Sequence, residues 1–92
     1  MKYRIVKTTR YRKELKKMLR RGKDIRKIGA VVRMLANGET LPPQYHDHAL
    51  INDLAGLRDC HIESDWVLLY TIKNDVLVLT LTRTGTHADL EL

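Results

Sequence analysis

The sequence predicts an α+β fold, in which two N-terminal helices pack against one face of a small antiparallel sheet. From Arg10 to Leu35 the apolar residues recur at the spacing of helices. After Leu41-Pro42-Pro43 the apolar and β-branched residues form short runs that are separated by turn-forming residues. With 92 residues, the chain is expected to form a single domain over residues 1–92.

An opening strand and the two helices account for the N-terminal region. Residues 3–7 are rich in β-branched and aromatic side chains, which predicts a short strand. A first helix begins near Arg10 and ends at Gly22, because glycine adopts the left-handed conformation that closes a helix. Asp24 caps a second helix, which ends near Asn37-Gly38. The apolar stripes of the two helices are Tyr11, Leu15, Met18 and Leu19, and Ile25, Ile28, Val32 and Leu35.

The second half of the chain predicts a loop followed by a three-stranded meander. Residues 44–53 are polar and rich in histidine, which indicates an extended loop. The strands are expected at residues 56–62, 66–73 and 76–82, with the middle strand most buried. Asn74-Asp75 predicts a two-residue turn, since both residues tolerate positive φ. Trp66, Tyr70 and Cys60 are expected in the core.

Composition excludes several classes of protein. The chain is 43% hydrophobic and 30% charged, which is typical of a folded domain. Cys60 is the only cysteine, so no intrachain disulfide or cysteine-rich zinc site can form. The longest apolar run, residues 66–70, is far shorter than the roughly 20 residues that span a bilayer. No apolar segment follows the first residues as in a secretory signal. We therefore expect a cytoplasmic protein without a membrane partner.

Charge is divided unevenly along the chain. Residues 1–33 carry fourteen Lys and Arg against two acids, a net charge of +12. Residues 34–92 carry three Lys and Arg against nine acids, a net charge of −6. A segregated basic half favours a polyanionic partner, and we interpret it as a surface for nucleic acid. The alternative is a well-solvated helical surface.

Histidine and aspartate dominate the candidate chemistry of the second half. The histidines are His46, His48, His61 and His87, and the nearby carboxylates are Asp47, Asp59, Asp65 and Asp89. They come from the loop, a strand end and the tail, which the meander brings toward one edge. Imidazole both donates and accepts a proton near neutral pH, so such a cluster indicates acid–base chemistry.

Five blocks of the sequence stand in a specific order and spacing. They are Leu41-Pro42, Tyr45-His46-Asp47-His48-Ala49-Leu50, Leu57-Arg58-Asp59-Cys60-His61-Ile62, Asp65-Trp66-Val67-Leu68-Leu69-Tyr70 and Arg83-Thr84-Gly85-Thr86-His87-Ala88-Asp89-Leu90. With these blocks the chain resembles the YafQ branch of the RelE/ParE toxin superfamily, which are bacterial ribosome-dependent mRNA interferases. The resemblance covers essentially the whole chain, although the helical part matches only as a basic, amphipathic pattern.

The resemblance implies a RelE-like fold and the toxin of a type II toxin–antitoxin system. Such a toxin cleaves mRNA in the ribosomal A site and is held inactive by a cognate antitoxin. The resemblance places the active-site histidines at His48, His61 and His87. It places the active-site aspartate at Asp65 and the active-site tryptophan, which we take as a substrate contact, at Trp66.

The implied reaction is RNA cleavage without a metal or cofactor, by attack of a 2′-hydroxyl on the adjacent phosphate. Two proton-transfer groups and added positive charge are needed for it. We expect His87 to be the general acid, Asp65 or His48 the base, and His61 an orienting or charge-stabilising group. Arg83 is the predicted phosphate contact, because a guanidinium donates in parallel to two oxygens.

The basic helices are the expected surface for binding partners. The cations expected to contact RNA of the ribosome are Lys13, Lys16, Lys17, Arg20, Arg21, Lys23 and Arg26. The same surface could instead receive an acidic antitoxin segment. At the tail the chain departs from the family, because Glu91 stands where a phenylalanine is frequent.

Three alternatives stay open at the level of sequence. The first is a superfamily relative that acts on DNA gyrase, against which the histidine set argues, since that branch is not a nuclease. The second is a nucleic-acid-binding module without chemistry, which would be indifferent to His87→Ala. The third is a His/Asp metal-dependent hydrolase, which EDTA would inhibit. His46-Asp47-His48 is the nearest sequence to a metal pair, with low specificity.

Overall fold

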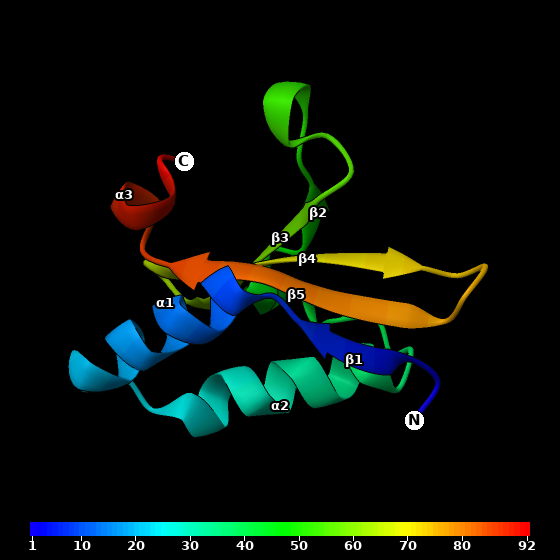
Figure 1. Ribbon diagram of the computed structural model, residues 1–92, viewed down its shortest axis with the longest axis horizontal. Helices are drawn as coiled ribbons and strands as arrows, with labels where there is room; N and C mark the ends of the chain where they lie inside the picture. The colour runs from blue at the N-terminus through cyan, green and yellow to red at the C-terminus, as the bar shows by residue number, and fades with distance from the viewer.

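Five strands form one sheet, and two helices lie against one of its faces (Figure 1). The computed structural model describes residues 1–92. The strands are β1 Arg4–Lys7, β2 His48–Ala49, β3 Arg58–Glu63, β4 Trp66–Lys73 and β5 Val78–Gly85. The helices are α1 Thr9–Arg20, α2 Ile25–Ala36 and α3 His87–Leu90, with 3₁₀ turns η1 Pro43–Tyr45 and η2 Asn52–Leu54. The predicted α+β architecture is confirmed, and α3 and the η2 loop rise from the face opposite α1 and α2.

The prediction of an antiparallel sheet is wrong at one edge. The strand order is β1-β5-β4-β3-β2, and β1 pairs with β5 in parallel, with Ile5 opposite Leu79. Strands β3, β4 and β5 do form the predicted antiparallel meander. A four-residue strand carries no signal for the direction of its partner. The helices and most of the meander separate β1 from β5 in the chain. The direction of their pairing is therefore set by the tertiary fold and not by residues near β1.

The turn before β5 and the loop before β3 also differ from the prediction. Residues 74–77 join β4 to β5, so the reversal is two residues longer than Asn74-Asp75 alone. Asp75 Oδ1 accepts a hydrogen bond from Val76 N at 3.1 Å, and Leu77 turns the chain with φ 52°. The expected loop at residues 44–53 contains the short strand β2, which pairs with the start of β3.

Both long helices begin at side-chain caps. Thr8 Oγ1 accepts a hydrogen bond from Tyr11 N at 2.9 Å, and Asp24 Oδ1 accepts one from Arg26 N at 3.0 Å. Gly22 follows α1 with φ 88°, a conformation that suits glycine. The predicted cap at Asp24 and the predicted end at Gly22 are confirmed. None of the helices combines the length and the apolar character that a membrane crossing requires.

Helix α1 covers the part of the β5 edge that β1 leaves unpaired. The register of β1 ends where Lys7 meets Leu81. Beyond that point Thr8 Oγ1 donates to Thr82 O at 2.8 Å, and Thr84 N donates to Glu14 Oε1 at 3.3 Å. These side chains satisfy edge groups that would otherwise need water or another strand. The contacts attach α1 to the strand that leads into α3.

Strand β4 is buried on both faces over its first five residues, which confirms the predicted burial of the middle strand. Trp66 and Tyr70 pack under α1 and α2 in a cluster that also contains Cys60. Val67 lies on the other face, where it packs with Leu90 of α3. All three residues that the sequence assigns to the core are therefore in it.

A buried hydrogen-bond relay fixes the end of β5 to β4. Trp66 Nε1 donates to Thr84 Oγ1 at 2.9 Å, and Thr84 Oγ1 donates to Val67 O at 2.8 Å. Both side chains are almost fully buried, so water cannot replace either bond. The relay thus holds the last residues of β5 against β4, just before α3.

Replacing Thr84 with valine tests this relay. The change leaves the buried Trp66 Nε1 without an acceptor, and we expect a loss of about 1–3 kcal/mol in the free energy of unfolding. The half-exposed Thr71 on β4 makes no side-chain hydrogen bond, so Thr71→Val is the matched control, with an expected change within about 0.5 kcal/mol. Urea denaturation measures both, and equal stabilities would contradict the relay.

Candidate active site

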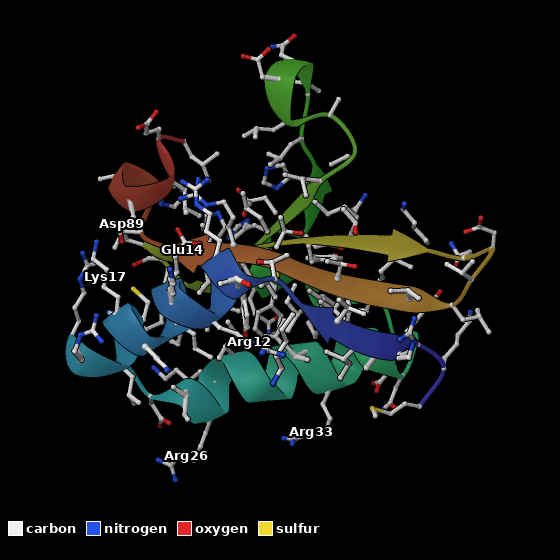
Figure 2. The ribbon with its side chains drawn as sticks, in the orientation of Figure 1. Arg12, Glu14, Lys17, Arg26, Arg33 and Asp89 are labelled. Atoms are coloured by element: carbon white, nitrogen blue, oxygen red, sulfur yellow. The ribbon has the colours of Figure 1, made fainter.

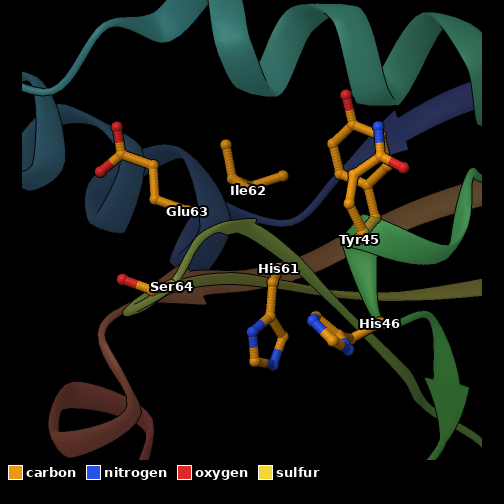
Figure 3. Close-up of a pocket in the computed structure, with 7 residues that line it drawn as sticks. Tyr45, His46, His61, Ile62, Glu63 and Ser64 are labelled. Atoms are coloured by element: carbon orange, nitrogen blue, oxygen red, sulfur yellow. The ribbon is translucent and has the colours of Figure 1, made fainter.

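Three imidazole rings lie in a row on the sheet face opposite α1 and α2. His61 of β3 is the central ring, opposite Val67 in the register. Its centroid lies 5.2 Å from that of His46 and 5.1 Å from that of His87. His46 follows η1, and His87 is the first residue of α3. Figure 3 shows His46 and His61 side by side. The structure thus brings His61 and His87 together and adds His46, for which no catalytic role was predicted.

Asp59 lies beneath these rings; the sequence names it among the carboxylates of the cluster but assigns it no role. It is 4% exposed, and its Oδ1 has no hydrogen-bond partner. His48 Nε2 and His61 Nε2 each lie 4.0 Å from its carboxylate. One feature of the sequence could have assigned it a role. Asp59 and His61 are two residues apart on one predicted strand, and side chains at that spacing lie on the same face of a sheet.

Burial and charge oppose each other at this carboxylate. Burial raises the pKa of Asp59, and the positive charges of His48, His61 and His87 act to lower it. Burial likewise lowers the pKa of His61, and Asp59 acts in the opposite direction. A proton gained by any of these imidazoles therefore favours the ionised form of Asp59, and the ionised carboxylate in turn stabilises the imidazolium.

The loop that carries His46 and His48 is tied to the core through Asp47. Asp47 Oδ1 accepts a hydrogen bond from Tyr70 Oη at 2.5 Å and one from Arg58 Nε at 3.3 Å. His48 Nδ1 lies 2.6 Å from His46 O, and because a carbonyl only accepts, Nδ1 carries the proton. The Nε2 of a neutral His48 is then the ring's basic nitrogen.

Asp65 in the β3–β4 turn holds His87 directly. Its Oδ1 lies 2.7 Å from His87 Nδ1 and accepts a hydrogen bond from His87 N at 2.9 Å. These two bonds lower the pKa of Asp65, so the side chain is a carboxylate at neutral pH. The carboxylate fixes the proton of His87 on Nδ1 and leaves Nε2 for exchange with a substrate. Asp65 is thus in the position of an orienting group.

Two predicted substrate contacts are engaged elsewhere. Trp66 is fully buried and donates to Thr84, so its ring is not open to a base. Arg83 points to α1, where its Nη2 lies 2.6 Å and its Nε 3.2 Å from Glu14 Oε2. The structure therefore does not support Trp66 or Arg83 as substrate contacts. The N–H groups that were expected to face the substrate instead donate to Thr84 and to Glu14 within the protein.

Internal ion pairs also occupy part of the predicted RNA surface. Lys17 and Arg21 bind Asp89, Lys23 binds Glu63, and Arg26 binds Asp24. Figure 2 shows Lys17 and Asp89 at the same end of the molecule. The three predicted cations without an ion-pair partner are Lys13, Lys16 and Arg20.

A hollow of about 450 Å³ adjoins the histidines (Figure 3). His46 and His61 line one end, and Tyr45 and Ile62 line the end toward α2. It follows the part of the β3 edge that the short strand β2 leaves unpaired. No group of three or more His, Cys, Asp or Glu side chains is arranged to hold a metal ion.

Comparison with known proteins identifies relatives of this fold and site. The sequence profile of the family described as "Bacterial toxin of type II toxin-antitoxin system, YafQ" matches residues 3–92. The mRNA interferase toxin YafQ of Escherichia coli K12 is 40% identical over 81 residues, which cover 87% of this chain and 86% of the relative.

Solved structures give the same relationship. The crystal structure of YafQ from E. coli BL21(DE3) superposes with a TM-score of 0.90 at 35% identity, covering 96% of this chain and 97% of that one. YafQ in the E. coli DinJ–YafQ complex gives a TM-score of 0.88 at 36% identity, with coverages of 96% and 97%.

Fold, site and relatives together define a bacterial toxin of the type II toxin–antitoxin class. Within that class the chain belongs to the YafQ family. The resemblance inferred from the five sequence blocks is therefore confirmed.

Replacing Asp59 with asparagine tests the electrostatic arrangement of the site. The change removes the negative charge that favours protonated His61, so we expect the pKa of His61 to fall. NMR titration of the imidazole protons measures it. Asp75→Asn in the distant β4–β5 turn is the matched control and should leave that pKa unchanged. An unchanged or increased pKa of His61 in the Asp59 variant would show that the two groups are not coupled.

Proposed function

We propose that this chain is a ribosome-dependent endoribonuclease that cleaves mRNA in the ribosomal A site. The observation that carries the proposal is the Asp65–His87 pair. The His87 ring lies next to that of His61, which in turn lies 4.0 Å from the buried carboxylate of Asp59. The name of the E. coli relative, an mRNA interferase, supports the choice of substrate. The site acts in the cytoplasm, where translating ribosomes are found.

The arrangement supports a metal-independent reaction with His48 as base and His87 as acid. His48 Nε2 removes the proton of the 2′-hydroxyl on the nucleotide 5′ to the break. The 2′-oxygen forms a bond to phosphorus while the bond from phosphorus to the 5′-oxygen breaks. Protonated His87 transfers its Nε2 proton to the departing oxygen. The products are a 2′,3′-cyclic phosphate and a 5′-hydroxyl.

The carboxylates assign the remaining roles. Of the two bases considered from sequence, Asp65 is engaged by His87, which leaves His48. Asp59 stabilises the imidazolium that forms when His48 takes the proton. His61 is partly buried, and its ring centroid lies 5.1 Å from that of His87; it contributes a donor to the phosphate oxygens.

The hollow beside His46 is the proposed place for a nucleotide next to the cleaved phosphate. Its volume lies in the range of about 300–1,000 Å³ that is typical of small-ligand sites. His46 and Tyr45 present ring faces of the kind on which RNA bases stack. A cognate antitoxin is the proposed second partner, because the E. coli relative was crystallised as a complex with DinJ.

His87→Ala tests the reaction on ribosomes programmed with a defined mRNA. We expect cleavage to slow by about 10²–10⁴-fold, because the variant has no proton donor for the leaving oxygen. Primer extension locates the cut, and phosphatase sensitivity identifies the ends. Glu91→Gln in the same tail is the matched control, with activity expected near wild type.

Other outcomes separate the competing functions. Equal cutting by both proteins would remove His87 as the acid. Toxin stripped with EDTA before addition should cut as fast as untreated toxin, and a loss that added metal restores would contradict the metal-independent scheme. Gyrase inhibition without RNA cleavage would favour the gyrase-directed relative. Salt-sensitive RNA binding without cleavage would leave a binding module.

The free cations of α1 predict the salt dependence of ribosome binding. Replacing Lys13, Lys16 and Arg20 together with glutamine should weaken binding. It should also flatten the plot of log affinity against log salt, by about 0.7–0.9 for each phosphate that the variant no longer neutralises. Sedimentation with ribosomes at several salt concentrations measures it, with Lys73→Gln as a single-charge control. An unchanged slope would place the RNA-binding surface elsewhere.

A further inference from the structure

We propose that Arg21 does not bind RNA. It binds Asp89 and thereby positions His87 for proton transfer. The proposal rests on the proposed function in one respect, the role of His87 as general acid. Arg21 and Asp89 are positioning residues, since both act through α3. From sequence, Arg21 was assigned to the RNA surface and Asp89 had no specific role.

Helix α3 cannot hold His87 in place by itself, because four residues are too few for a stable helix. A capping box fixes its start: Asp89 N donates to Thr86 Oγ1 at 3.1 Å, and Thr86 N donates to Asp89 Oδ2 at 2.9 Å. Leu90 fixes its other end by packing on Val67. The carboxylate of Asp89 therefore belongs to the turn that presents His87.

Arg21 binds this same carboxylate from the end of α1. Its Nη1 lies 2.6 Å from Asp89 Oδ2, and its Nη2 lies 3.2 Å from Asp89 Oδ1. Lys17 Nζ lies 3.7 Å from Oδ1. The Arg21 hydrogen bond is the largest of the causes that lower the pKa of Asp89. A two-pronged interaction of this kind restricts orientation as well as distance.

Both partners are themselves confined. Arg21 Nη1 also contacts Met18 Sδ at 3.6 Å, and Met18 is buried. On the other side, a Cβ at Gly85 would lie 3.0 Å from Asp89 Cβ and 3.1 Å from its Oδ2. Glycine at residue 85 is what allows the carboxylate to approach β5 so closely. The Arg21–Asp89 pair thus joins the packed interior of α1 to the backbone of α3.

The His87 ring is then held at two points. Asp65 fixes Nδ1 of the ring, and the Arg21–Asp89 pair fixes the backbone turn that carries the ring. Proton transfer depends on placement within a fraction of an ångström, and a misplacement of about 1 Å can cost about 10²-fold in rate. A second set of pairs, Lys23 and Lys27 on Glu63, holds the strand end before Asp65 in the same manner.

The test compares Arg21→Gln, Asp89→Asn and the double variant in the ribosome cleavage assay. We expect each single change to lower kcat by about tenfold to a hundredfold with little change in KM. The double variant should be no slower than Asp89→Asn, because that single change already removes the charge that Arg21 binds. Arg21→Lys keeps the positive charge but not the two-point contact of the guanidinium. Its kcat should lie between those of wild type and Arg21→Gln.

Lys13→Gln is the matched comparison, since it removes a free cation from the same helix. It should raise KM and leave kcat unchanged. If Arg21→Gln behaves like Lys13→Gln, with a raised KM, an unchanged kcat and an inert Asp89→Asn, then Arg21 binds RNA and the proposal is wrong. Additive decreases of kcat in the double variant would also overturn it.

A readout without RNA separates this proposal from the function itself. In the free toxin, the NMR signal of the His87 ring should shift or broaden alike in Arg21→Gln and Asp89→Asn, but not in Lys13→Gln. If wild type does not cleave, the proposed function fails while this signal still decides the positioning. An undisturbed His87 signal in both variants would overturn the positioning. Thermal unfolding of each variant identifies a general loss of folding.

Discussion

The two-sided burial of β4 is the constraint on which the rest of the structure depends. A strand without access to water must satisfy its backbone through its neighbours, so β3 and β5 are fixed to it on either side. The register places Asp59 opposite Leu69 and Thr84 opposite Leu68. The distance between the site residues of β3 and the helix that follows β5 is therefore set by the pairing of both strands with the buried β4.

Asp65 and Asp59 have different roles in the site because they differ in burial. Asp65 is largely exposed and has a lowered pKa, so it remains charged and holds one imidazole. Asp59 is buried with a raised pKa, and its charge is most stable when a neighbouring ring is protonated. Carboxylates whose environments move their pKa values apart are a common basis for dividing acid and base roles. Here the division follows from the strand face and the turn on which each residue lies.

Local signals in the sequence predicted the helices, the meander and most residues of the core, although Leu19 and Ile25 of the predicted apolar stripes are exposed. Caps such as Asp24 and the apolar spacing act within a few residues, so a single sequence displays them. Pairings between distant segments were not visible. Arg21 meets Asp89 across 68 residues, and Arg83 meets Glu14 across 69, so both cations looked free in the sequence. The parallel edge strand and the engaged indole of Trp66 were missed for the same reason.

The single cysteine has a practical consequence for labelling. Cys60 is fully buried, and burial raises the pKa of its thiol, so the native chain offers no reactive thiolate to a maleimide. Ile51 is 75% exposed next to η2, on the loop that rises from the same face of the sheet as α3. An Ile51→Cys variant would carry one reactive thiol on an otherwise silent background. A fluorophore attached there could report the arrival of RNA or antitoxin while every native residue of the site is kept.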